Sequence, residues 1–304
     1  MKTRIILDTD IGTDVDDFLA LSLLLASPEL QLEAVTCVYG DVQLRAHITR
    51  KLLDIRGNQH IPIYCGASKP LLGLRPIYWP GHEGQGILND NDPPITLPDE
   101  HAVNFIVRTV MQNPGQIHLA AIGPLTNIAL ALSIEPRLVD NLAGITMMGG
   151  ALRLNDFSLR YGEHNILCDP EAAHIVFASG APIRMIPLDV TLKTRITHQD
   201  MLEISENKHP FQQMIADQLR RYPFFAENGY TFMHDPLAIA SLVEPSMLDW
   251  MDVHIDVVLE GQQYAGATLS KTGTGGSPLN VKAAVGVDSE RFQYMLVERI
   301  VGWV

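Results

Sequence analysis

Apolar segments of two kinds alternate along the first 190 or so residues of the chain. Short runs rich in β-branched residues have the character of buried strands, and they occupy 4–7, 32–40, 61–66, 116–123, 145–150 and 182–189. Segments with helical spacing of apolar positions lie between them, at 18–26, 44–55, 101–111, 125–134 and 169–180. Strands that alternate with helices predict an α/β fold with an open, mostly parallel, doubly wound sheet and helices on both faces.

Polar clusters follow five of the predicted strands. They are the aspartate-rich segment 8–17, the pair 40–41, and the segments 123–127, 149–150 and 189–191. Open parallel sheets bind ligands beyond the carboxyl ends of their strands, so these clusters predict a site at that edge. The long connections 67–100 and 151–169 flank the same edge, and loops of this length are commonly lids.

Charge and composition narrow the class of protein. With 304 residues, 46% of them hydrophobic, the chain can bury a large core, and we expect a single domain over 1–304. A net charge of -13 argues against nucleic acid or an anionic membrane as a partner, because such surfaces need clustered cations. A small neutral or cationic ligand fits better. No apolar run is long enough for a membrane-spanning helix.

The compartment is predicted from the cysteines and the first residues. Cys37, Cys65 and Cys168 are widely spaced and form no C-x-x-C pair, which is typical of reduced thiols. The opening MKTRIILDTD lacks the apolar run and the cleavage site of a secretion signal. We therefore expect a cytoplasmic protein.

The densest chemical signal is the cluster Asp8, Asp10, Asp14, Asp16 and Asp17. Carboxylates this close repel one another, and a hard cation is the economical way to neutralise them. Oxygen ligands with flexible geometry favour Ca²⁺. Helix capping is the alternative for one of the last two aspartates. Strand alternation puts Asp8 and Asp10 on the same side of the chain, and Asp10, which is nearer the edge of the sheet, is the better ligand. Asp8 is equally consistent with a buried acceptor, and Asp14 with a solvated loop position.

Two further segments place acids before apolar helices. Asp235, followed by Pro236, has the pattern of a helix N-cap, and that interpretation is the stronger one for the segment taken alone. Asp169, followed by Pro170, has the same pattern, and we assign it as a cap. In the loop before it, only Glu163 and Asn165 then remain as functional candidates.

The chain resembles the inosine-uridine-preferring nucleoside hydrolases over nearly its whole length. The motifs are IILDTDIGTDVDD, CVYGD, GHEGQG, GPLTNIA, MMGGA, EHNILCDPEAA, HDPLA and NVKAAVGVD, in that order. Their order and spacing make the match specific. The resemblance implies hydrolysis of the bond between ribose and a nucleobase, a Ca²⁺ cofactor and a homodimer or homotetramer.

The resemblance also implies roles for individual residues. The implied Ca²⁺ ligands are Asp10, Asp17, Asp235 and the carbonyl oxygen of Ile122, and two ribose hydroxyls complete the shell. Asp10 is the implied general base, and Asp16 the implied acceptor from the ribose 2′-hydroxyl. The other implied substrate contacts are Glu163 and Asn165 at the far end of the sugar, Met148 beneath it, and His234 at the leaving group.

The chemistry itself calls for such groups. A leaving nucleobase creates an oxocarbenium-like sugar, which carboxylates stabilise, and a metal lowers the pKa of the attacking water. His234 is a reasonable proton donor if its pKa is near the ordinary ~6.5. His82 is a second donor candidate, although a lone loop histidine is commonly solvated.

The chain departs from the family pattern D-x-D-P-G-x-D-D at its first motif. Ile11 replaces the proline, and two extra residues precede Asp16 and Asp17; another alignment would put Asp14 in place of one of them. Asp41 stands where the family favours Asn, which adds a negative charge close to the sugar. These changes leave the choice of nucleobase open.

Two rival functions remain. A catalytically silent calcium- or nucleoside-binding protein would keep the carboxylates without turnover, although the presence of both Asp10 and His234 argues against it. A haloacid-dehalogenase-like phosphatase would need a D-x-D-x-[TV] loop, which DTDIGT misses by one position. We rank the hydrolase first, the binding protein second and the phosphatase third.

Overall fold

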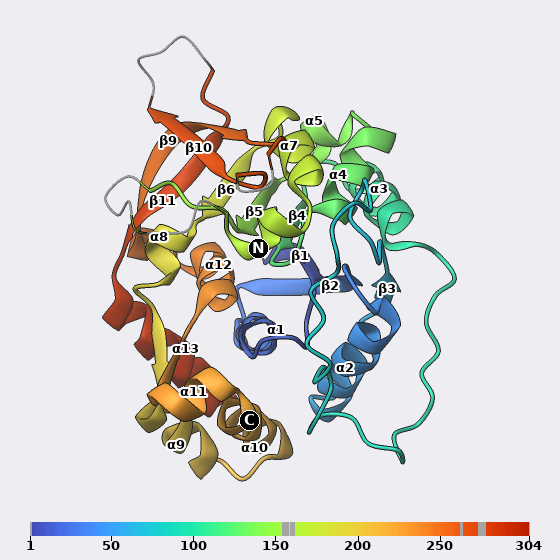
Figure 1. The fold of residues 1–304 in the computed structure, drawn as a ribbon. Helices are drawn as coiled ribbons and strands as arrows, with labels where there is room; N and C mark the ends of the chain where they lie inside the picture. Colours follow the sequence, from blue (N-terminus) through green and yellow to red (C-terminus); the bar gives the residue numbers. More distant parts are fainter. Residues whose placement is uncertain (1, 154–157, 159–161, 262–263, 273–277, 304) are drawn as a thin grey trace.

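A computed structural model describes residues 2–153, 158, 162–261, 264–272 and 278–303 (Figure 1). Within these residues the main sheet has nine strands in the order β10-β9-β11-β6-β5-β4-β1-β2-β3. The strands are β1 (Thr3–Thr9), β2 (Leu30–Cys37), β3 (Ile63–Cys65), β4 (Ile117–Ala121), β5 (Gly144–Met148), β6 (Ile183–Ile186), β9 (Leu248–Val257), β10 (Thr268–Thr272) and β11 (Val281–Val287). A separate pair joins β7 (Arg195–Thr197) to β8 (Tyr230–Phe232).

The neighbours from β11 through β6, β5, β4, β1 and β2 to β3 pair in parallel, which confirms the predicted mostly parallel sheet. At one end β9 pairs antiparallel with both β11 and β10. The helices are α1 (Asp16–Ala26), α2 (Val42–Ile55), α3 (Ala102–Gln112), α4 (Thr126–Ile134), α5 (Leu138–Asn141), α6 (His164–Cys168), α7 (Pro170–Ala178), α8 (Leu188–Thr191), α9 (His198–Glu206), α10 (Pro210–Arg221), α11 (Pro223–Asn228), α12 (His234–Val243) and α13 (Ser289–Gly302), with a 3₁₀ turn at Pro245–Met247.

The helices form a layer on each face of the sheet, as expected for a doubly wound fold. Alternate side chains of β1 enter different cores: Ile5 and Leu7 pack with residues of α1, α12 and α13, whereas Ile6 packs with residues of α3, α4 and α7. Figure 1 shows α1 and α12 on one side of the sheet and α4 and α7 on the other. Among the described residues, no helix is long and apolar enough to cross a membrane.

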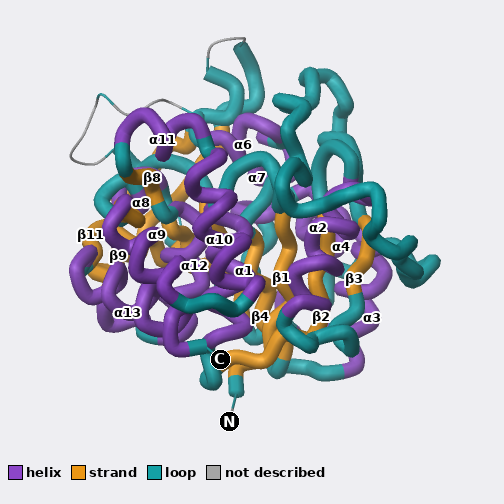
Figure 2. Tube along the Cα trace, turned by 90° about the horizontal axis from the view of Figure 1, so that it is seen from below, coloured by secondary structure: helices purple, strands orange, loops and turns teal. Residues whose placement is uncertain are grey.

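The strand-to-helix loops of the parallel sheet gather at one edge. Figure 2 shows this edge at the top, with the chain termini at the opposite end of the molecule. The long connection before α3 folds over this edge: the backbone N–H of Leu71 donates to Asp169 (2.8 Å), and that of Tyr78 donates to the hydroxyl of Tyr39 (2.8 Å). Part of the second long connection, at 154–157 and 159–161, lies outside the described residues.

Candidate functional site

Three buried carboxylates meet where α1 and α12 begin. Asp16 and Asp17 form the first turn of α1, and Asp235 is the second residue of α12, which packs against α1. Oxygen atoms of the three side chains all lie within 4.8 Å of one another. Met233, whose side chain forms no cap hydrogen bond, precedes α12, so the interpretation of Asp235 as an N-cap is wrong. Its carboxylate instead joins the acidic group.

Burial and mutual repulsion destabilise the charged forms of these acids. Burial raises the pKa of Asp16, Asp17 and Asp235 well above the ordinary range, and neighbouring carboxylates raise it further: first Asp14 for Asp16, Asp10 for Asp17, and Asp16 for Asp235. A cation held among the three would reverse this penalty. The donors are oxygen atoms alone, which fits a hard divalent ion.

Asp10 lies beside this group, at the end of β1, and is buried. A Cβ built on Gly123 would come within 2.8 Å of Oδ1 of Asp10, so the glycine lets the carboxylate approach the backbone that follows Ile122. The three mutually close carboxylates are therefore Asp16, Asp17 and Asp235, with Asp10 as their neighbour. The roles of Asp10 in the metal shell and of Asp16 at the sugar stay predictions.

The other two aspartates of the cluster, Asp8 and Asp14, bond to other parts of the fold. Asp8 is fully buried, accepts hydrogen bonds from Thr36 and from Nδ2 of Asn127 (2.8 Å), and has a pKa raised to about 7 mainly by burial. It is therefore the buried acceptor. Asp14 is a half-buried loop residue that accepts a hydrogen bond from the hydroxyl of Tyr222 (2.7 Å).

Arg45 is a site residue that the sequence reading missed. It lies on α2, its side chain is fully buried, and its guanidinium donates to the carbonyl oxygens of Asp10, Ile11 (2.8 Å) and Tyr39 (2.6 Å). Its positive charge lowers the pKa of Asp17, against the larger effect of burial. The sequence offered one signal for it: Arg45 is a cation directly beside the apolar stripe of the predicted helix 44–55, where a charged side chain can be drawn into the interior.

Four residues predicted to serve the metal or the sugar do come together, at the ends of β4 and β5. Glu163 is the N-cap of α6 and accepts from the backbone N–H groups of Asn165 (2.9 Å) and Gly150 (2.9 Å). Nδ2 of Asn165 donates to the carbonyl oxygens of Ile122 (2.9 Å) and Met148 (3.2 Å). The capping role of Glu163 was not predicted, whereas the cap at Asp169 is confirmed, since its side chain accepts from the N–H of Ala172.

His234 begins α12, with Nδ1 2.8 Å from Oγ1 of Thr191. Burial lowers the pKa of His234 to about 4, so the imidazole is neutral near pH 7 and the argument from an ordinary histidine pKa is wrong. A neutral ring still carries one N–H that can donate.

The two remaining predicted contacts lie in loops. His82 is exposed, and its Nε2–H donates to the carbonyl oxygen of Thr13 (2.9 Å). Asp41 is exposed and caps α2 by accepting from the N–H groups of Gln43 (3.1 Å) and Leu44 (2.9 Å). A contact between either side chain and a substrate stays a prediction.

A cavity of about 320 Å³ lies at the loop that leads into α1, and Asp14 is the aspartate of the cluster that lines it. Its lining includes Thr13 and Asp14 from the loop before α1, His82 and Gln85 from the long connection, and Arg221 and Tyr222 at the end of α10. Polar groups from three separate segments thus surround a space whose lining extends to Val15, the residue before Asp16.

Comparison with known proteins adds independent findings. The family model described as inosine-uridine preferring nucleoside hydrolase matches residues 5–294. An inosine-uridine preferring nucleoside hydrolase from Crithidia fasciculata is 34% identical, with 99% of this chain and 98% of that protein covered. A pyrimidine-specific ribonucleoside hydrolase from Escherichia coli is 29% identical over 100% of this chain and 98% of that protein. The solved structure of a purine-preferring ribonucleoside hydrolase from Gardnerella vaginalis superposes with a TM-score of 0.88 at 33% identity, covering 99% of this chain and 98% of that one.

Proposed function

The chain belongs to the inosine-uridine preferring nucleoside hydrolase family, and from this membership we propose that it hydrolyses the N-glycosidic bond of ribonucleosides to ribose and a free nucleobase. The observation that carries the proposal is the buried group of Asp16, Asp17 and Asp235, which stands at the carboxyl edge of the sheet. Residues 1–304 would act as a single catalytic domain. A cytoplasmic homodimer or homotetramer stays a prediction from the sequence.

The acidic group suits a divalent metal, and we assign Ca²⁺ because every side-chain donor is a carboxylate oxygen. Asp10, Asp17, Asp235 and the carbonyl oxygen of Ile122 would hold it, with Asp16 close enough to contribute. Ile122 already accepts from Asn165, but a carbonyl oxygen has a second lone pair to offer. When bound, Ca²⁺ supplies Lewis acidity that lowers the pKa of water and an anchor for the ribose hydroxyls.

The residues of the chain would share the chemistry as follows. Asp10 takes the proton of the attacking water, and its carboxylate stabilises the positive charge that develops on the sugar. Asp16 accepts from the 2′-hydroxyl. Arg45 holds the backbone carbonyl of Asp10 and so positions this base. The remaining sugar contacts are proposed for Asp41, Met148, Glu163 and Asn165.

The leaving nucleobase would enter the cavity lined by His82 and Tyr222. His234 acts as a neutral donor: if Nδ1 accepts from the hydroxyl of Thr191, the proton stands on Nε2 and is free for the base. Nε2 of His82 is committed to Thr13, which makes His82 the weaker candidate donor.

A panel of ribonucleosides assayed for reducing sugar and free base tests the proposal. Release of both products, lost in Asp10→Asn, is the expected result. Binding of nucleosides without any turnover under calcium would instead identify a silent binding protein and reject the hydrolase. The panel also decides the base preference, for which the relatives point in different directions.

A further inference from the structure

A second cavity, of about 910 Å³, lies at the other edge of the sheet, where the parallel strands begin. Its lining includes the first residues of β1, β5, β6 and β11, namely Thr3, Gly144, Ile183 and Val281. Strand β1 runs from Thr3 at this cavity to Thr9 beside the carboxylates. At ~3.3 Å per residue, the two sites are roughly 20 Å apart.

Two cations without an ion-pair partner among the described residues line this second cavity. Arg184 on β6 and Lys282 on β11 are register partners in adjacent parallel strands, so their side chains leave the sheet on the same face. The guanidinium carbon of Arg184 lies over the ring of Trp250, 5.9 Å from the ring centroid. Asp252 on β9 is the register partner of Lys282 but forms no ion pair with it. The chain has a net charge of -13, so carboxylates are abundant, yet neither cation is paired with one.

Two further polar groups on this face, on β5 and β4, add hydrogen-bonding capacity and carry no charge themselves. On the side of β6 away from β11, Arg184 has Thr146 of β5 as its register partner. Oγ1 of Thr146 lies 2.9 Å from Nε2 of His118. Burial, and then the charge of Arg184, lower the pKa of His118 to about 4, which keeps the ring neutral. Nδ1 of His118 has no hydrogen-bond partner among the described residues and can serve a ligand.

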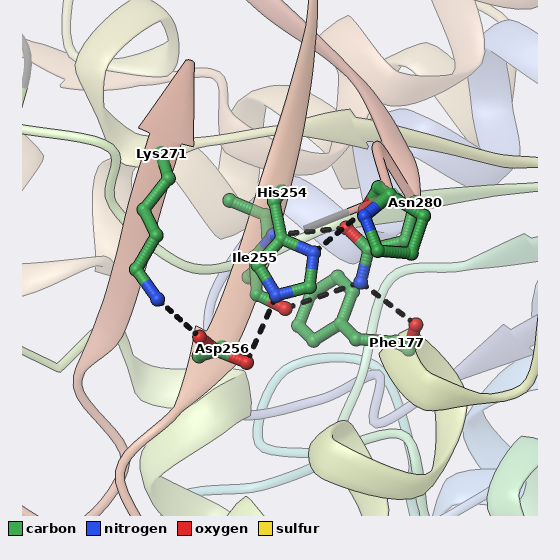
Figure 3. Close-up of polar contacts among 7 residues, drawn as sticks. Phe177, His254, Ile255, Asp256, Lys271 and Asn280 are labelled. Atoms are coloured by element: carbon green, nitrogen blue, oxygen red, sulfur yellow. Dashed lines mark hydrogen bonds and ion pairs between the residues drawn. The ribbon is translucent and has the colours of Figure 1, made fainter. Parts of the chain in front are cut away.

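Two other polar residues of the lining, His254 on β9 and Asn280 just before β11, already have partners. Figure 3 shows Lys271 and His254 pointing to Asp256, each at 3.1 Å. Asn280 bonds the backbone of Ile255 and of Phe177. The lining therefore holds two cations without an ion-pair partner, Arg184 and Lys282, and one carboxylate, Asp252, so positive charge exceeds negative charge there.

We propose that this cavity binds a small dianion, a phosphate group that is either free or carried by a small metabolite, between Arg184 and Lys282. One guanidinium and one ammonium can donate charged hydrogen bonds to the phosphate oxygens, and such bonds are strong. The ribonucleoside substrate is uncharged, so this site serves a different ligand. Its existence does not depend on the proposed catalysis.

Calorimetric titration of the whole protein with inorganic phosphate tests the site, above neutral pH, at fixed ionic strength and without added calcium, which would precipitate phosphate. We expect saturable binding at one site per chain. Arg184→Gln and Lys282→Gln should each weaken it by about tenfold or more. The matched control Lys271→Gln removes the same charge from the same sheet, but Lys271 already pairs with Asp256 and does not line the cavity, so affinity should stay within about twofold.

Glycerol 3-phosphate, with glycerol as its uncharged control, separates the two sources of phosphate. Tighter binding of the ester than of inorganic phosphate identifies a metabolite, and equal or weaker binding identifies free phosphate. Arg184→Lys keeps the charge and should retain part of the affinity, which distinguishes a lost ligand contact from a lost fold. Absence of saturable binding to the wild-type protein, or unchanged affinity in both glutamine variants, overturns the proposal.

Discussion

Replacing Asp235 by asparagine should stabilise the metal-free protein while destroying its metal site. Oxygen atoms of Asp16, Asp17 and Asp235 lie within 4.8 Å of one another. Two unit charges 4.8 Å apart repel by about 3.5 kcal/mol at an effective dielectric of about 20, so with all three acids charged the substitution would remove repulsion of about 7 kcal/mol. Burial and repulsion raise the pKa of all three acids, and bound protons already relieve part of this cost. We therefore expect a gain of about 1–3 kcal/mol in the free energy of unfolding near neutral pH.

Urea unfolding of protein freed of metal by a chelator measures the effect. The matched control is Asp90→Asn at an exposed position, which should change the free energy of unfolding by no more than about 0.5 kcal/mol. The wild type without metal should lose stability as the pH rises above about 4, because the folded protein, whose carboxyl pKa values are raised, binds more protons than the unfolded chain. This slope should flatten in Asp235→Asn. Saturating Ca²⁺ should stabilise the wild type by about 2.7 kcal/mol at a hundredfold excess over Kd, and the variant far less. A metal-free variant less stable than the wild type, or equal stabilisation of both by Ca²⁺, would refute the reasoning.

Four further outcomes are expected. Asp10→Asn should lower kcat by several orders of magnitude with an unchanged circular dichroism spectrum, since the amide fills the same space but takes no proton; a loss below about tenfold would remove Asp10 as the base. His234→Ala should lower kcat by about 10²-fold, and because the pKa of His234 is about 4, the pH profiles of variant and wild type should run parallel from pH 6 to 8; a wild-type limb near pH 6.5 that vanishes in the variant would contradict a neutral donor. Deoxyuridine and deoxyinosine should react up to ~10⁴-fold more slowly than uridine and inosine in kcat/KM; equal rates would mean that Asp16 does not bind the 2′-hydroxyl. Arg45→Met should lower the free energy of unfolding in urea by about 3 kcal/mol or more, because it leaves buried carbonyl oxygens without a hydrogen-bond donor; a loss below about 1 kcal/mol would show that these oxygens find other partners.

The parallel part of the sheet follows from local pattern. A strand buried on both faces needs a continuous apolar run, and its covering helix needs apolar positions on one stripe, so the alternation up to residue 189 predicts these elements and their order. The antiparallel end is different. Strand β9 reads LDWMDVHIDV, with polar residues throughout, and its direction depends on pairing with β11 and β10, which come later in the chain. Local sequence carries no such information.

The candidate site divides in the same way. The sequence by itself determined that carboxylates cluster at the end of β1, because adjacent residues of one segment cannot separate. Only the tertiary structure brought Asp235 to them, through the packing of α12 on α1, and turned a cap-like Asp-Pro pair into a member of the acidic group. It also decided which groups titrate normally, since the lowered pKa of His234 and the raised pKa of Asp16 come from burial. Burial and long-range proximity arise from how the elements pack, and a linear pattern records neither.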